Sequence, residues 1–249
     1  MSKKAWIIFA AICIVLLGGL VYLSSKNKVD VGAVDTNKIQ AATAASGDIA
    51  DHVFGKADSK VMLVEYGDYQ CPGCGSAYPT IKQVTEKYEG QLAFVFRNFP
   101  LADKHPNARA AAAAAEAAGI QGKFWEMHNK LYETQASWGS LTSDKRGSFF
   151  EGYAQELGLK TDVFKTNFAS TKVGTKINFD QAIGKKAGVN ATPTFYLNGQ
   201  PVDQYVKDGA IVSGDTAGAS PIWSDASALE KLVLIPAFKS AGIDISNAK

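Results

Sequence analysis

Residues 65–74 read EYGDYQCPGC, and they join a predicted strand to a predicted helix. The residues at 61–66 are β-rich and mostly apolar, and the run has the length expected for a buried strand. Pro72 suits the first helical position, where its missing N–H costs nothing. This stretch therefore places the pair Cys71 and Cys74, spaced C-x-x-C, at the start of a helix.

A cysteine at a helix start is suited to redox chemistry. The unpaired backbone N–H groups and the positive end of the helix dipole stabilise a thiolate, which is the form of cysteine that attacks disulfides. Cys71 is therefore the predicted nucleophile. Cys74 lies one turn later, faces inward, and is predicted to resolve the mixed disulfide.

Two structural interpretations of the pair are weaker. A structural zinc site needs about four ligands, but the sequence has no second cysteine pair, and His52, His105 and His128 are widely separated. An inert disulfide is also disfavoured, because a four-residue loop at a helix start is a poor place for one. We expect neither a metal nor a cofactor.

Strand and helix signals continue on both sides of a central helical block. A second strand over 92–96 completes a βαβ unit with a right-handed crossover. The later periodicity predicts helices over 108–118, 123–134, 144–157, 162–170 and 172–187, strands over 194–197 and 201–206, and a last helix over 225–240. The predicted order is βαβ, the helical block, then ββα.

The run 61–74, the kinking Pro79 and the later sequence ATPTF at 191–195 resemble the thioredoxin superfamily. A helical block inserted between two β parts resembles its DsbA branch, especially the membrane-anchored DsbA-like proteins of bacteria. The resemblance covers about Asp51 to Gly242. It implies an α/β thioredoxin fold with a helical insertion over about 105–187, and thiol–disulfide exchange through the cysteine pair.

The resemblance also implies roles for residues outside the pair. Pro193 matches the family's cis-proline, which packs against the disulfide and, with Thr192, helps to bind the substrate chain. X-Pro bonds are cis in only about 5–6% of folded cases, but the place of this one before a β-rich run predicts cis. Glu65 matches a buried acid that transfers a proton for the resolving cysteine. The alternative is a surface-facing carboxylate, since burying one without a partner is costly.

One residue departs from the family pattern. Gly73 occupies the position where the DsbA branch often has histidine, which strengthens the stabilisation of the thiolate. The resemblance associates glycine at this position with a moderate oxidant or a reductase. The sequence therefore leaves the strength of oxidation open.

An unbroken apolar run over 5–23 follows Lys3 and Lys4. As a helix, its nineteen residues reach roughly 28 Å, about the hydrocarbon thickness of a bilayer, which predicts an uncleaved transmembrane anchor. The alternative is a cleaved signal peptide. Its apolar region is typically about 7–15 residues and ends at small residues, and no such site follows Leu23. The anchor would leave residues 1–4 in the cytoplasm.

Residues 24–50 are small, polar and poorly periodic, which predicts a tether with one short helix near 36–46. The folded domain is expected over 51–242, followed by a tail over 243–249. The chain after the anchor holds one cysteine pair and no odd thiol, which fits an oxidising compartment. A net charge of +2 in 249 residues gives no basic face for nucleic acid.

These features predict a single-pass cell-membrane protein whose catalytic domain lies outside the cytoplasm. The favoured reaction is disulfide donation to unfolded or newly exported cysteine-containing proteins. The resemblance implies that a membrane quinone-linked partner re-oxidises the pair, and the anchor would contact membrane lipid. The rival interpretations are a reductase or isomerase that uses the same residues, and a binding or chaperone module in which the cysteines form only a structural bridge.

Overall fold

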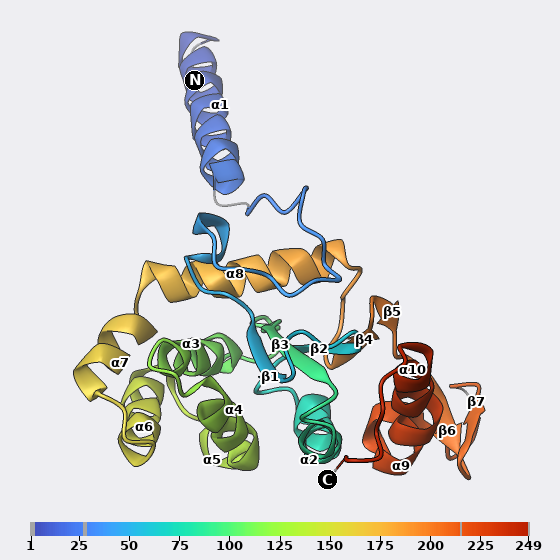
Figure 1. Ribbon diagram of the computed structural model, residues 1–249. Coiled ribbons are helices and arrows are strands. Elements are labelled where there is room, and N and C mark those ends of the chain that lie inside the picture. The colour runs from blue at the N-terminus through green and yellow to red at the C-terminus, as the bar shows by residue number, and fades with distance from the viewer. Residues whose placement is uncertain (1–2, 27–28, 215, 249) are drawn as a thin grey trace.

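The computed structural model describes residues 3–26, 29–214 and 216–248 (Figure 1). Its larger sheet has the strand order β1–β3–β2–β4–β5, and its smaller sheet has the order β7–β6–β8. The strands are β1 His52–Gly55, β2 Met62–Gly67, β3 Ala93–Asn98, β4 Thr194–Leu197, β5 Gln200–Pro201, β6 Tyr205–Lys207, β7 Ala210–Val212 and β8 Ser220–Pro221. The larger sheet is mixed, because β2 runs parallel to β3 and antiparallel to β4.

Helices flank the larger sheet and form a block beside it (Figure 1). They are α2 Pro72–Lys87, α3 Ala108–Gly119, α4 Phe124–Glu133, α5 Gln135–Trp138, α6 Ser143–Glu156, α7 Thr161–Phe168 and α8 Thr171–Lys186. Helix α2 carries the chain from β2 to the parallel strand β3, as the predicted βαβ unit requires. The predicted helices of the block are present with ends within two residues of those expected, and α5 is an unpredicted short addition.

The two faces of β2 pack against different helices. Val64 and Tyr66 belong to a hydrophobic cluster with Ile183 of α8. Side chains alternate along a strand, so Leu63 and Glu65 point to the opposite face. There, Leu63 packs in a second cluster with side chains of α2. Glu65 therefore lies inside the protein, on the face of the sheet that α2 covers.

The C-terminal part differs from the predicted hairpin and single helix. After β5 the chain enters the small sheet, which the sequence did not predict. The last helical run consists of α9 Ala226–Leu229, a π-helical turn η3 Glu230–Leu234 and α10 Ile235–Ser240. Pro236 lies at the start of α10 and has no N–H to donate, which interrupts the regular i→i−4 bonding there. Ile243 and Ile245 of the predicted tail pack against the core.

The segment 29–50 packs against the domain, where the sequence predicted a free tether. Four of its apolar residues contact the hydrophobic cluster between the sheet and α8: Val29, Val31, Val34 and Ile39. The ammonium group of Lys186 in α8 donates hydrogen bonds to three backbone carbonyls of the segment. Its one short helix, η1, spans only Ala44–Ser46. The scattered β-branched residues of the segment thus make apolar contacts with the domain, which its mainly polar composition did not predict.

Arg97 of β3 anchors this segment from within the core. Its fully buried guanidinium donates to the carbonyl oxygens of Thr36 at 2.7 Å and Lys38 at 2.6 Å. The same guanidinium donates to Oδ2 of Asp51 at 2.8 Å, and Lys176 of α8 donates to Oδ1 at 3.0 Å. Two buried cations therefore share one carboxylate, and the chain on both sides of Asp51 belongs to the folded unit.

Helix α1 spans Lys3–Lys26 and stands apart from the domain in Figure 1. Its exposed large apolar side chains are Trp6, Ile7, Phe9, Ile12, Ile14, Val15, Leu16 and Leu17. Within the described ranges, no helix is both long enough and apolar enough to cross a membrane. The predicted cytoplasmic residues 1–4 lie partly outside the described residues, which begin at Lys3.

Candidate active site

The pair Cys71 and Cys74 lies at the N-terminus of α2. Cys71 is the N-cap residue and has an extended backbone, and Pro72 follows it in the first turn. Cys71 is 8% exposed, whereas Cys74 is fully buried. Both thiols are free in the structure. Only the outer cysteine is therefore placed to meet a thiol or disulfide from outside.

Hydrogen bonds stabilise the thiolate of Cys71. The strongest comes from the thiol of Cys74; a contact with Thr192 and the backbone N–H groups of Cys74 and Gly73 add to it. Together they lower the pKa of Cys71 to about 5, although burial opposes them. The carbonyl oxygen of Thr192 lies 3.3 Å from Sγ and accepts a hydrogen bond when the thiol is protonated. At neutral pH the sulfur is therefore mainly thiolate.

The pKa of the inner thiol, Cys74, is shifted in the opposite direction. Burial raises the pKa of Cys74 well above its usual value, and the hydrogen bond to Cys71 and the negative charges of Glu65 and Cys71 add to the effect. The backbone N–H of Asp68 donates to its sulfur at 3.5 Å. One motif therefore holds a thiolate at its outer position and a protonated thiol at its inner position. The inner thiol needs a base before it can attack.

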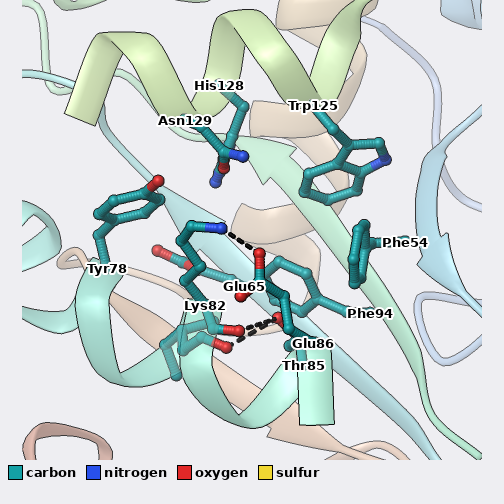
Figure 2. Close-up of a pocket in the computed structure, with 11 residues that line it drawn as sticks. Phe54, Glu65, Tyr78, Lys82, Thr85, Glu86, Phe94, Trp125, His128 and Asn129 are labelled. Carbon is teal, nitrogen blue, oxygen red and sulfur yellow. Dashed lines mark hydrogen bonds and ion pairs between the residues drawn. The ribbon is translucent and has the colours of Figure 1, made fainter. Parts of the chain in front are cut away.

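Glu65 is the ionisable group best placed to serve as that base. It is 3% exposed, so the surface-facing alternative is wrong. Burial, followed by the negative charge of Cys71, raises the pKa of Glu65 to about 8. Figure 2 shows it among the residues that line a pocket between α2 and α4. The ion pair Lys82–Glu86 is part of the pocket lining, so a path from Glu65 leads toward solvent.

The loop before β4 reaches the cysteines from the far side. Its Thr192–Pro193 peptide bond is cis, as predicted. Both residues are half-buried, and Gly73 packs directly against the proline ring. The structure therefore brings Cys71, Thr192 and Pro193 together at the surface, with Glu65 in the interior.

Side chains outside the predicted site residues hold the loop 68–71 in place. The carboxylate of Asp68 accepts a hydrogen bond from the backbone N–H of Leu101 at 2.8 Å, and it lies 2.7 Å from Nδ1 of His105. Gln135, at the start of α5, donates to the carbonyl oxygen of Cys71 at 3.0 Å. No local pattern marks Gln135, because 64 residues separate it from its partner.

The arrangement is suited to thiol–disulfide exchange. The outer thiolate can attack or be attacked, the inner thiol can close the ring, and the buried acid can give or take its proton. Among the residues that the structure describes, no group of three or more His, Cys, Asp or Glu side chains could hold a metal ion.

Comparison with known proteins yields one family model over most of the chain. The model, described as Thioredoxin, matches residues 48–212. Curated relatives match over 150 residues: Na(+)/H(+) antiporter NhaA 1 of Salinispora arenicola at 39% identity and Na(+)/H(+) antiporter NhaA of Herminiimonas arsenicoxydans at 32%. Each match covers 60% of this chain and 22% of the relative. The chain thus spans about a fifth of the length of these relatives.

Solved structures share the fold. BdbD from Bacillus subtilis has a TM-score of 0.58 and 21% identity, over 80% of this chain and 97% of that one. Alpha-DsbA1 from Wolbachia pipientis has a TM-score of 0.59 and 20% identity, over 77% and 92%. MdbA, a thiol-disulfide oxidoreductase from Corynebacterium diphtheriae, has a TM-score of 0.52 and 21% identity, over 66% and 88%. At these identities the likeness is one of fold.

Proposed function

Because the chain belongs to the thioredoxin family, we propose that it donates the disulfide of its own cysteine pair to exported proteins. Its fold is the predicted α/β thioredoxin fold with an inserted helical block, of the DsbA type. Family membership and the cysteine pair at the start of α2 confirm the predicted class, a thiol–disulfide oxidoreductase. The proposal concerns the direction of exchange, its clients and its place in the cell.

The contrast between the two thiols is the observation that carries the proposal. In the first step, a substrate thiolate attacks Sγ of Cys71, the Cys71–Cys74 bond breaks, and its electron pair goes to Cys74. A second substrate thiolate then attacks the substrate sulfur of the mixed disulfide, and Cys71 leaves as a thiolate. Since a thiol of lower pKa leaves faster, the pKa of about 5 for Cys71 favours release of the oxidised substrate.

We assign proton transfer to Glu65. The thiolate that forms on Cys74 has a raised pKa and therefore takes up a proton. Glu65, whose pKa is about 8, carries a proton at neutral pH and lines a pocket that leads toward solvent. In the reverse direction the same carboxylate would remove the proton before Cys74 attacks.

We assign binding of the substrate chain to Thr192 and Pro193. The position of the two residues beside the cysteine pair supports this assignment. The Thr192 carbonyl oxygen lies 3.3 Å from Sγ of Cys71, and Pro193 adjoins Gly73 at the start of α2. Both side chains are half-buried and therefore partly open to a docking peptide.

The proposed place of action is the outer side of a cell membrane. Residues 5–23 would form a single-pass anchor in contact with lipid, and the exposed apolar side chains over 6–17 support this. A single even cysteine pair after the anchor supports an oxidising compartment. The clients would be unfolded or newly exported cysteine-containing proteins, and a membrane quinone-linked partner would re-oxidise the pair.

The anchor has a direct test. Mature protein should keep residues 1–23 and sediment with membranes after cell lysis. Recovery of a soluble protein that begins near Ser24 would show a cleaved signal peptide instead.

The deciding measurement for direction is the reduction potential of the pair in glutathione buffers, combined with oxidation of a reduced, unfolded client protein. A potential above that of glutathione, and loss of activity in Cys71→Ser, would support disulfide donation. Gly73 favours the second candidate, a reductase or isomerase, and a potential below that of glutathione would support it. Full activity in Cys71→Ser would support the remaining alternative, a binding or chaperone module in which the cysteines form only a structural bridge.

A further inference from the structure

The backbone of Asp68 is hydrogen-bonded to both cysteines of the redox pair. Its N–H donates to Sγ of Cys74 at 3.5 Å, and its carbonyl oxygen accepts from the backbone N–H of Cys71 at 3.0 Å. Burial raises the pKa of Cys74, whereas the hydrogen bond from Asp68 lowers it. The position of Asp68 therefore determines whether a backbone donor lies beside the buried sulfur.

The side chain of Asp68 is held by more hydrogen bonds than a local turn requires. Oδ1 accepts from the backbone N–H of Gln70 at 2.8 Å, which closes a turn of the kind that aspartate commonly forms. Oδ2 accepts from the backbone N–H of Leu101 at 2.8 Å and lies 2.7 Å from Nδ1 of His105. Because a carboxylate can only accept, Nδ1 of His105 carries the hydrogen. The turn needs only the first of these bonds.

The bonds to Oδ2 keep a carboxylate in the interior. Asp68 is 1% exposed, and burying a charged group is costly. Both donors to Oδ2 come from a single turn after β3, since the N–H of His105 bonds to the carbonyl oxygen of Leu101 at 2.9 Å. This turn lies 37 residues along the chain from Asp68. A distant part of the chain therefore fixes the loop 68–71 through its one buried carboxylate.

We propose that His105 and Asp68 are positioning residues, which hold a backbone N–H of the loop where it stabilises the thiolate of Cys74. This inference rests on the proposed exchange reaction but holds in either direction. When a thiolate attacks Sγ of Cys71, the Cys71–Cys74 bond breaks and its electron pair goes to Cys74. The Asp68 N–H stabilises that charge until Glu65 supplies a proton. In reverse, Cys74 gives its proton to Glu65, attacks Cys71, and expels the bound thiolate, and the same N–H stabilises the attacking sulfur.

The test compares His105→Leu with His105→Asn in the full chain. Leucine removes the donor to Asp68, whereas asparagine keeps an N–H near the place of Nδ1. The first readout is the single-turnover rate at which glutathione opens the Cys71–Cys74 disulfide. The second is the pKa of Cys74 in a Cys71→Ser background, from its alkylation rate against pH.

His105→Leu should slow the opening of the disulfide by about fivefold and raise the pKa of Cys74 by about 0.7 unit. These effects are smaller than those of losing a whole hydrogen bond to a charged group, because the N–H of Asp68 is displaced rather than removed. His105→Asn should recover most of the rate and of the titration.

His52→Leu is the matched control. His52 also pairs with a buried carboxylate, since its Nε2 lies 2.9 Å from Oε2 of Glu116, and the side chains of His52 and His105 are 16% and 19% exposed. The other oxygen of Glu116 accepts from Asn98 of β3, so this pair lies outside the loop 68–71. His52→Leu should therefore leave both readouts at their native values, even if it lowers the stability in urea unfolding as much as His105→Leu does.

The outcomes separate this inference from the proposed function. Native values of both readouts in His105→Leu, or an equal effect of His52→Leu, would overturn the positioning role. If His105→Leu does not fold, His105→Gln takes its place, because its amide N–H lies one bond beyond Nδ1, and a native rate in that variant would overturn the proposal. A native protein that performs no exchange with thiols would instead refute the proposed function, and the Cys74 titration would still test the hydrogen bond.

Discussion

Gly73 and Pro193 are in contact so close that a Cβ atom at Gly73 would lie 3.3 Å from Cδ of the proline. The same atom would lie 3.7 Å from Sγ of Cys71 and 3.8 Å from the carbonyl oxygen of Thr192. The start of α2 and the cis-proline loop therefore leave little room for a Cβ atom at position 73. Any side chain at position 73 would border both the reactive sulfur and the proposed substrate surface.

Replacing Gly73 with histidine should make the protein a stronger oxidant. An imidazole would place a positive charge or an N–H donor beside the Cys71 thiolate, where glycine offers only its backbone. Since a more stable thiolate favours the reduced form, the pKa of Cys71 should fall below about 5. The potential should rise by about 30 mV, which corresponds to about 1.4 kcal/mol for this couple. Titration of both proteins in glutathione buffers measures the change.

Gly73→Ala is the steric control for this experiment. Alanine adds the same Cβ atom against Pro193 but brings no charge or donor. An equal rise in the alanine variant would mean that displacement of the proline loop changes the potential. An unchanged or more reducing potential in the histidine variant would mean that the surrounding fold sets the potential.

In the reduced protein, iodoacetamide should label Cys71 and spare Cys74. At pH 6 the outer thiol is mainly ionised, because its pKa is about 5, whereas the inner thiol is buried and protonated. The labelling rate should rise with pH along a single titration curve with its midpoint near 5. Peptide mass mapping identifies the labelled residue, and preferential labelling of Cys74 would reverse the assignment of nucleophile.

The sequence predicts the elements that local patterns encode. Pro72 marks the start of α2, so this helix begins where its signal lies. Strand β1 and the small sheet escape prediction for a physical reason. Strand β1 has four half-buried or exposed residues and forms by pairing with β3, while each strand of the small sheet has two or three residues.

The residues of the active site also fall into those that the sequence predicts and those that only the fold reveals. The C-x-x-C motif locates both cysteines, and the family resemblance locates Glu65 and Pro193. Gln135 belongs to the helical block and reaches the site only through the tertiary fold. A hydrogen bond across 64 residues, such as that from Gln135 to the Cys71 carbonyl, leaves no periodic signal in the sequence.

Glu65→Gln should stabilise the protein at neutral pH. The pKa of Glu65 is about 8 in the folded protein and 4.5 ordinarily, so between these values the folded state holds one more proton than the unfolded state. Stability therefore falls by about 1.4 kcal/mol per pH unit as pH rises through that window. Glutamine, neutral throughout, avoids this loss, so the variant should gain roughly 2–3 kcal/mol at pH 7 and nothing near pH 4. Urea unfolding of the reduced proteins at several pH values measures the difference.

The oxidised protein provides the control for the Glu65 experiment. Disulfide formation removes the negative charge of Cys71, which is the second cause of the raised pKa, so the gain should be smaller than in the reduced protein. A stability difference that does not change between pH 4 and 7 would show that the pKa of Glu65 is not raised in the folded state.

Removal of the segment 29–50 should destabilise the domain, although its composition resembles that of a tether. A protein that begins at residue 29 keeps the carbonyl oxygens that Arg97 uses, whereas a protein that begins at residue 51 leaves this buried guanidinium with Asp51 and Tyr66 alone. Each lost hydrogen bond to a charged group costs about 1.5–3 kcal/mol. The shorter protein should therefore be less stable by about 3 kcal/mol or more in urea unfolding.

Lys38→Ala in the longer protein is the matched control for this truncation. Arg97 donates to the backbone carbonyl of residue 38, and the Lys38 side chain is 77% exposed, so the substitution should leave stability unchanged. The truncation and this control together distinguish the backbone hydrogen bonds to Arg97 from the effect of the Lys38 side chain. Equal stability of the proteins that begin at 29 and 51 would mean that water replaces the two carbonyls around Arg97. The segment would then be the free tether that its composition predicts.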